Sequence, residues 1–246
     1  MSYDFSPNAA PRVEIRTIGR ERHPVAVIDG VLNDPRSVVS FASERVRFRR
    51  VAPAANFYPG VRAPVPQPYM FALFAGVKGV MHEVFGLPLE SGLKADCSFS
   101  MVTMQPHELS VLQRLPHFDT VDPTQLAVLH YLCAPELGGT AFYRHCATGY
   151  ESINVERHAR YLEVLNQEIA ANPPAPDYYR GDARFESTAV FPAQFDRVIV
   201  YRSQLLHAGD IRAACNFSDD PRIGRLTANA FFRTQLAAES KLDPDR

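Results

Sequence analysis

The spacing of apolar residues changes at about residue 94, and the part before it predicts a strand followed by helices. Residues 24–32 (PVAVIDGVL) form an apolar run with the length of a buried strand that ends in a turn. Asp34 and Pro35 then mark a helix start, because the aspartate can cap the first turn and proline fits the first helical position. Residues 50–68 contain five prolines and predict a long loop, interpreted either as a plain loop or as a lid. Residues 69–86 are apolar on more than one face and predict a buried helix.

The second part has the shorter period of β-strands. Its apolar segments are short, rich in β-branched and aromatic residues, and bounded by Gly, Pro and Asp. One helix is expected within 151–171. Helices first and strands later predict an α+β fold, with a double-stranded β-helix core (a jelly roll, or cupin-like) and the N-terminal helices packed on one sheet. The strands are expected within 97–105, 125–132, 138–145, 197–204 and 225–234.

No repeat or low-complexity linker divides the chain, so residues 1–246 are expected to form a single domain. Within it, residues 1–94 would supply helical support and a lid region, and residues 95–235 the β-helix core. The tail 236–246 is charged and expected to be solvated, and residues 1–12 are expected to be frayed.

Composition narrows the class of protein. The 26 basic and 27 acidic residues give a net charge of −1, which argues against a nucleic-acid-binding protein. There is no long apolar run to span a membrane, and the first residues do not resemble a secretory signal. Four scattered cysteines without a CxxC pair are typical of reduced thiols, so a cytoplasmic location is expected. The sequence leaves a homodimer open.

The candidate chemistry begins with His117 and Asp119. Residues two apart in a strand point to the same side, so one imidazole and one carboxylate could reach a single metal ion. His207 follows directly after another apolar strand, and Arg225 opens the last one. A buried arginine needs an anionic partner. Two histidines with one carboxylate form the facial triad of non-haem Fe(II) oxygenases.

In this order, the motifs resemble those of the Fe(II)/2-oxoglutarate-dependent oxygenases, most closely the prolyl-hydroxylase-like branch. The resemblance implies that His117, Asp119 and His207 bind Fe(II) and act as the catalytic centre. It implies that Arg225 binds the distal carboxylate of 2-oxoglutarate. The same resemblance assigns further cofactor-binding positions on two strands, which are Tyr131, Leu129, Thr227 and Asn229.

The resemblance further implies an activity. Such an enzyme would use O2 and 2-oxoglutarate, release succinate and carbon dioxide, and hydroxylate an unactivated C–H bond of a small molecule or a peptide side chain. Halogenating relatives replace the carboxylate ligand, whereas this chain keeps Asp119, which favours hydroxylation or desaturation. The segment 138–142 (GGTAF) is one residue shorter than the family pattern, so either Thr140 or Ala141 could face the metal. Arg222 is a rival to Arg225.

Two other functions remain open at this point. A zinc hydrolase or lyase on a cupin-like barrel could use the same three ligands, but it would need a general base near the metal and would have no use for Arg225. A non-catalytic binding module would not bring the three ligands together, or would have a plugged site. His145 is interpreted either as a buried sheet histidine or as a substrate contact.

Overall fold

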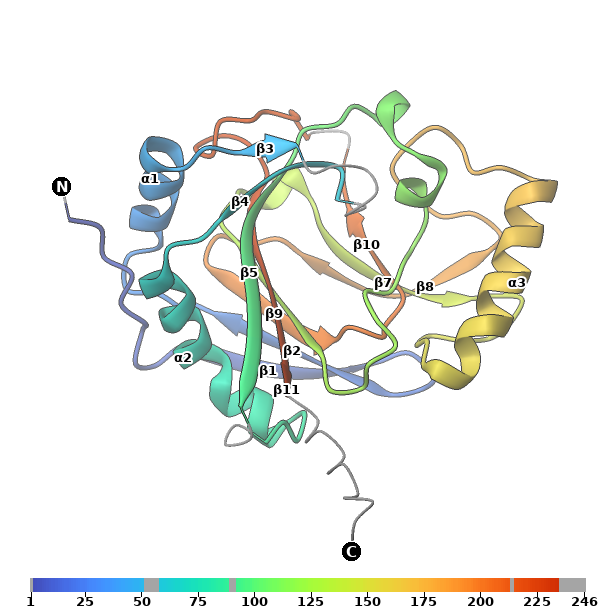
Figure 1. Cartoon of the computed structure of the whole chain (residues 1–246), viewed down its shortest axis with the longest axis horizontal. Coiled ribbons are helices and arrows are strands. Elements are labelled where there is room, and N and C mark those ends of the chain that lie inside the picture. The colour runs from blue at the N-terminus through green and yellow to red at the C-terminus, as the bar shows by residue number, and fades with distance from the viewer. Residues whose placement is uncertain (1, 51–57, 89–91, 213–214, 235–246) are drawn as a thin grey trace, which may run out of the picture.

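Two antiparallel sheets and three α-helices form the part of the chain that this computed structural model describes, residues 2–50, 58–88, 92–212 and 215–234 (Figure 1). The strands of the larger sheet are β1 (Arg12–Ile18), β2 (His23–Asp29), β3 (Arg49–Arg50), β4 (Gly60–Pro64), β5 (Leu93–Val102), β6 (Leu126–Tyr131), β9 (Arg197–Arg202) and β11 (Leu226–Thr234). They lie in the order β1-β2-β9-β6-β11-β5-β4-β3. The smaller sheet contains β7 (Gly139–His145), β8 (Phe185–Pro192) and β10 (His207–Asp210), in the order β10-β7-β8.

Capping side chains mark the start of two of the three described α-helices. The Asp34 carboxylate accepts backbone N–H groups at the start of α1 (Pro35–Arg45), as the sequence predicts. The apolar segment expected to be a buried helix is α2 (Gln67–Glu83). Asn154 caps α3 (Val155–Ala171), which lies within the range expected for a helix. Three short 3-10 turns span Pro106–Glu108, Val111–Arg114 and Pro135–Leu137.

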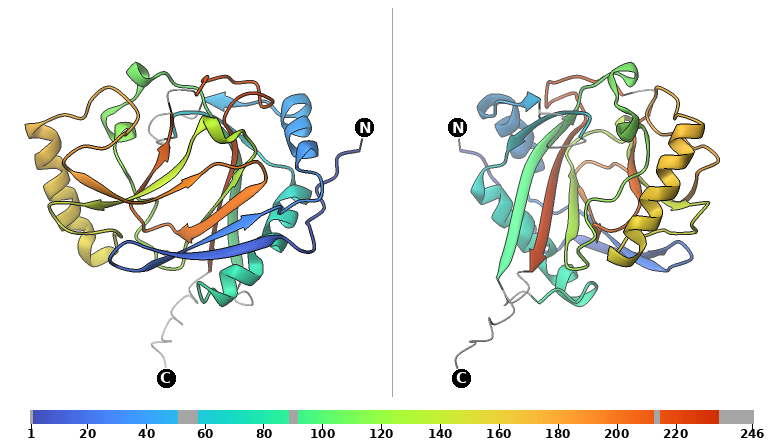
Figure 2. Two further views of the ribbon diagram at one scale, coloured as in Figure 1. Left: turned by 180° about the vertical axis from the view of Figure 1, so that it is seen from behind. Right: turned by 45° about the vertical axis from the view of Figure 1, so that its right-hand side comes forward.

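Successive side chains of the central strands point to opposite faces of the larger sheet and pack into different cores. The molecule is therefore layered, with α1 and α2 on one side of the sheets and α3 on the other (Figures 1 and 2). Outward side chains such as Val128 and Val200 pack against α1 and α2 in one core. Inward side chains such as Ile199 meet Phe142 of the smaller sheet in a second core. The other face of the smaller sheet packs against α3 around Tyr161. The two N-terminal helices therefore cover one face of the larger sheet, as expected.

Two adjacent glycines set the spacing of the smaller sheet. A Cβ on Gly139 would collide with the carbonyl oxygen of Phe191 on β8. Gly138 has a φ of 114°, and a Cβ there would collide with the carbonyl oxygen of Asp210 on β10. Only glycine lets three strands approach this closely. These contacts position β10, the strand that begins at His207.

Several expectations about the chain were incomplete or wrong. The six predicted strands are present as β2, β5, β6, β7, β9 and β11, but β1, β3, β4, β8 and β10 were not predicted. The proline-rich segment 50–68 contains strand β4 and the start of α2, so it is not one long loop; its residues 51–57 lie outside the described residues, as does the tail 236–246. The strands form two separate sheets and do not close into one barrel. All four cysteines are free thiols, and no described helix is long and apolar enough to cross a bilayer.

The N-terminal segment is packed and not frayed. Asn8 donates its backbone N–H to the Val31 carbonyl at 2.8 Å, and Pro7 forms an antiparallel bridge with Leu32. The Phe5 ring lies edge-on to Tyr69 of α2, with 6.2 Å between ring centroids. Aromatic contacts and backbone hydrogen bonds therefore fix a segment whose sequence shows no strand or helix period.

Candidate metal centre

Backbone hydrogen bonds bring His117 and His207 together. Each of the two residues donates its N–H to the other's carbonyl oxygen at 2.8 Å, as an isolated antiparallel bridge. Asp119 donates its backbone N–H to the Ser203 carbonyl at 2.9 Å. His117 and Asp119 therefore lie in an irregular segment, and the expectation of a regular strand there was wrong. The bridge from His117 to β10, and not a regular strand, holds His117 beside the other potential metal ligands.

The side chains of these three residues converge. His117 Nε2 lies 3.9 Å from Asp119 Oδ1, and His207 Nε2 lies 3.9 Å from Asp119 Oδ2. The potential ligand atoms of all three residues lie within 4.8 Å of one another. Two nitrogen donors and one carboxylate at this separation could bind one transition-metal ion from one side and leave its other side open.

The protonation states suit a metal site. His207 Nδ1 lies 2.8 Å from the Leu205 carbonyl oxygen, which can only accept, so Nδ1 carries the proton and Nε2 keeps a lone pair for a ligand bond. Burial lowers the pKa of His207 to about 4. Desolvation, and then the neighbouring His207, lower the pKa of His117 as well. Burial raises the pKa of Asp119 to about 6, against the opposing effects of His117 and Arg62. Both imidazoles are therefore neutral at neutral pH.

A cavity of about 430 Å³ opens beside the three side chains. Of the residues that the sequence assigns to a cofactor, Arg225, Leu129 and Asn229 line this cavity. Tyr131 and Thr227 are fully buried and lie behind its wall. The cavity is large enough for two small molecules.

Arg225 is a buried cation at the cavity wall. It is 3% exposed, and its Nη2 donates to the Gly139 carbonyl at 2.9 Å. Its guanidinium carbon lies 5.9 Å from the centroid of the Tyr131 ring. Its Nε has no hydrogen-bond partner among the described residues. A buried guanidinium without an anionic partner is costly, so the site fits an anion that would complete it.

Residues around Arg225 are fixed by short hydrogen bonds. The Tyr131 and Thr140 hydroxyls are 2.6 Å apart, and Thr140 lines the cavity. Ala141 instead belongs to the core under α3, which answers the question that the shortened GGTAF segment left open. The Thr227 hydroxyl lies 2.9 Å from Asn229 Oδ1.

Two alternatives from the sequence do not lie in the cavity. Arg222 is exposed and pairs with Asp220 at 2.9 Å, so it is not a rival to Arg225. His145 contacts Thr148 at 2.9 Å and Glu168 at 2.8 Å, so it is a buried histidine with both ring nitrogens engaged and not a substrate contact.

The cavity also contains residues from the proline-rich segment. Tyr58, Pro59 and Arg62 line it from the segment around β4. The sequence left this segment open as a plain loop or a lid, and it assigned none of the three side chains a role in binding. Arg62 donates its Nε–H to the Ser100 hydroxyl at 3.1 Å.

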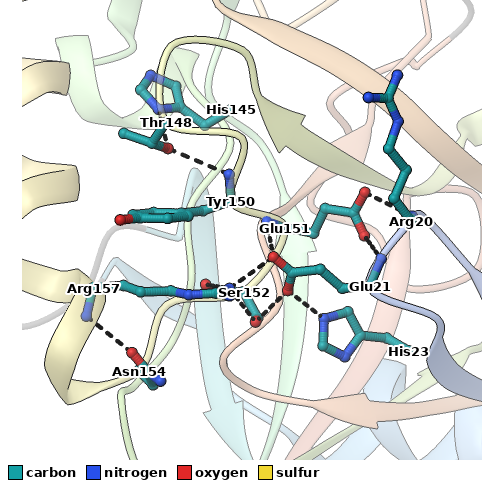
Figure 3. Close-up of polar contacts among 10 residues, drawn as sticks. All are labelled: Arg20, Glu21, His23, His145, Thr148, Tyr150, Glu151, Ser152, Asn154 and Arg157. Atoms are coloured by element: carbon teal, nitrogen blue, oxygen red, sulfur yellow. Dashed lines mark hydrogen bonds and ion pairs between the residues drawn. The ribbon is translucent and has the colours of Figure 1, made fainter.

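A second group of metal-ligating side chains, Glu21, His23 and Glu151, serves the fold instead (Figure 3). The buried Glu151 carboxylate accepts the backbone N–H groups of Arg20 at 2.9 Å and Glu21 at 3.0 Å. The Glu21 carboxylate contacts His23 at 2.9 Å and accepts from Arg157 at 2.7 Å. Donors of the chain itself thus satisfy both carboxylates, and the group fastens the β1–β2 turn to the start of α3.

Comparison with known proteins finds one matching family and several solved structures of low sequence identity. The model of a family described as "Family of unknown function (DUF6445)" matches residues 9–232. No curated protein matches the sequence. The chain is similar to the crystal structure of HygX from Streptomyces hygroscopicus with nickel, 2-oxoglutarate, and hygromycin B bound, at 14% identity over 86% of this chain and 83% of that chain, with a TM-score of 0.48. It is similar to the non-haem alpha ketoglutarate dependent epimerase SnoN from nogalamycin biosynthesis, at 12% identity over 87% of this chain and 79% of that chain, with a TM-score of 0.47. It is also similar to the non-haem alpha ketoglutarate dependent carbocyclase SnoK from nogalamycin biosynthesis, at 14% identity over 87% of this chain and 81% of that chain, with a TM-score of 0.46.

Proposed function

The chain belongs to the DUF6445 family, and we propose that it is a non-haem Fe(II)- and 2-oxoglutarate-dependent oxygenase that hydroxylates a small molecule or a peptide side chain. The observation that carries this proposal is the convergence of His117, Asp119 and His207 beside a buried arginine without an anionic partner. The motif order in the sequence supports the same assignment. The two facing sheets would be the two halves of a double-stranded β-helix.

The donor set fits Fe(II). Two neutral imidazoles and one carboxylate suit a divalent first-row metal, and the cavity leaves room on its open side for a chelating cosubstrate. His117 and His207 would bind through Nε2, because the Leu205 carbonyl engages Nδ1 of His207 and Nε2 of His117 is the nitrogen that faces Asp119. When bound, iron, 2-oxoglutarate and O2 would supply an oxidant able to remove hydrogen from an unactivated C–H bond, with release of succinate and carbon dioxide.

The buried arginine fits the far carboxylate of 2-oxoglutarate. A guanidinium binds a carboxylate through paired N–H groups, and the free Nε of Arg225 supplies a donor for this purpose. The Tyr131 ring supports the guanidinium from behind, and Thr140 holds the Tyr131 hydroxyl at 2.6 Å. These residues would orient the cosubstrate, and the enclosing walls would limit the entry of water.

The zinc hydrolase alternative has less support. It calls for a general base beside the metal, yet Asp119 is the only carboxylate among the described residues that line the cavity. It also leaves a buried arginine without a role. A binding module without catalysis is disfavoured because the three ligands converge beside an open cavity. A cytoplasmic location remains part of the proposal.

An anaerobic titration tests the proposal directly. Fe(II) and then 2-oxoglutarate are added to the full chain, and the weak visible charge-transfer band of the chelate is recorded. The band is expected in the wild type and in His107→Ala, which changes an exposed histidine outside the cavity. It should be absent in His207→Ala. A wild-type protein without the band, or with succinate release that needs no Fe(II), would contradict the proposal.

A further inference from the structure

We propose that the substrate of this site is a small carboxylic acid whose carboxylate is bound by Arg62. This inference rests on the proposed function and names a substrate class for it. It starts from Arg62, a second cation in the cavity. Arg62 is separate from the buried Arg225 that would bind the cosubstrate.

The sheet register directs Arg62 into the cavity. Arg62 on β4 lies opposite Ser100 on β5, and Ser100 lies opposite Thr227 on β11. Directly opposite residues share one face of a sheet, so Arg62 is on the inner face together with Thr227. Its guanidinium carbon lies 6.0 Å from the centroid of the Tyr58 ring, which also lines the cavity.

Arg62 has no carboxylate partner among the described residues. Its Nε–H donates to the neutral Ser100 hydroxyl at 3.1 Å. Several other arginines pair with acids, as Arg197 does with Asp29 at 2.6 Å. Among the described residues that line the cavity, the one carboxylate is that of Asp119, which would bind the metal. A part-buried guanidinium that faces a cavity has the properties of an anion-binding group.

The charges of the complete site lead to the same conclusion. Asp119 contributes one negative charge to the cavity wall, and Arg62 and Arg225 contribute two positive charges. A divalent ion and the dianion 2-oxoglutarate cancel each other. One positive charge therefore remains after the metal and the cosubstrate are in place. A monoanionic substrate would neutralise it, whereas a cationic substrate would add to it.

The positions of the two arginines separate their roles. Arg225 is 3% exposed, whereas Arg62 is only partly buried and thus lies nearer to solvent. Both charges act on Tyr58: burial raises the pKa of its hydroxyl, and Arg225 and Arg62 oppose this rise. The two cations therefore both lie near the same tyrosine. The deeper one suits a cosubstrate that binds first, and the outer one suits a molecule that enters after it.

A paired panel of ligands tests the role of Arg62. Small carboxylic acids, including hexanoate, phenylacetate and N-acetyl-L-leucine, are each compared with their own carboxamide by calorimetry. The full chain is used with and without anaerobic Fe(II) and 2-oxoglutarate. At least one acid should bind ten or more times more tightly than its amide. Arg62→Gln should remove this preference without changing amide binding, and Arg62→Lys should retain part of it.

Two controls make the result specific. Arg50→Gln removes an exposed arginine from the neighbouring strand β3, outside the cavity, and should keep the preference. The 2-oxoglutarate affinity of Arg62→Gln should stay within threefold of wild type. A panel in which no acid binds more tightly than its amide would overturn the inference, and so would a loss in Arg62→Gln no larger than that in Arg50→Gln. A lost charge-transfer band in the wild type would instead refute the proposed oxygenase, because the acid and amide comparison is also made without the cosubstrate.

Discussion

Replacing Arg225 by methionine should stabilise the protein without ligand and strongly weaken its response to 2-oxoglutarate. The substitution removes a hydrogen bond from a charged donor to the Gly139 carbonyl, worth about 1.5–3 kcal/mol. It also removes a buried ion without an anionic partner among the described residues, and such an ion costs several kcal/mol. Methionine fills a similar volume with apolar atoms. The free energy of unfolding should therefore rise by about 1–3 kcal/mol.

Ligand binding should change in the opposite direction. Removing one partner of a buried, hydrogen-bonded charge pair costs about 2–5 kcal/mol, which weakens 2-oxoglutarate binding by about 30-fold to 5,000-fold. Urea and thermal unfolding are measured with and without anaerobic Fe(II) and 2-oxoglutarate. The wild type should be stabilised by the cosubstrate, because a ligand that binds the folded state raises its stability. Arg225→Met should unfold at a higher temperature than the wild type without ligand and should need at least about 30 times more cosubstrate for the same stabilisation.

Arg222→Met is the matched control, because it removes an exposed arginine a few residues away that pairs with Asp220. Its stability should change by about 0.5 kcal/mol or less, and its response to 2-oxoglutarate should stay at the wild-type level. A loss of more than about 1 kcal/mol in Arg225→Met would refute the reasoning, since it would make the arginine a structural residue. Equal stabilisation of both proteins by 2-oxoglutarate would refute it as well.

Three further predictions concern the metal ligands and the supports of the fold. Metal affinity should be constant above pH 6 and fall about tenfold per pH unit below it, because the ion must displace the proton that Asp119 holds at its raised pKa of about 6. Calorimetry that finds constant affinity down to pH 4.5 would contradict this. Glu151→Gln should lower the free energy of unfolding by about 1.5–3 kcal/mol in urea, since its carboxylate accepts two backbone N–H groups; a loss below about 0.5 kcal/mol would be inconsistent with that role. His130→Leu should cost about 3–5 kcal/mol, because buried Asp196 would lose its partner at 3.0 Å, yet any iron chelate should still form; an unchanged unfolding midpoint would argue against the pairing.

Signals that lie within a few residues predicted much of this fold. The Asp34 cap and the following proline set the start of α1, because capping needs only the first turn. The strand expected within 125–132 is β6, and its alternation places Tyr131 in the inner core. The neighbouring His130 lies on the opposite face, where its ring contacts the Tyr69 hydroxyl at 2.8 Å and the Asp196 carboxylate.

Features that depend on distant partners could not be read in this way. Strand β10 is four residues long and contains a glycine, so it has no apolar alternation of its own, and it exists because β7 pairs with it. His117 adopts its place through a bridge to a residue far along the chain. Arg62 lies in a segment rich in proline, and only the register of β4 against β5 reveals that it faces the cavity.

The reciprocal backbone bonds between His117 and His207 have a practical consequence for anyone who purifies this protein. They are made by main-chain atoms during folding, so the entropy of bringing two imidazoles together is lost before any ion arrives. A preformed metal-binding site of this kind discriminates poorly among divalent ions, and nickel, copper or zinc would outcompete ferrous iron by intrinsic affinity. Preparations from ordinary media should therefore contain mixed metals, and chelation followed by anaerobic reloading should precede every assay.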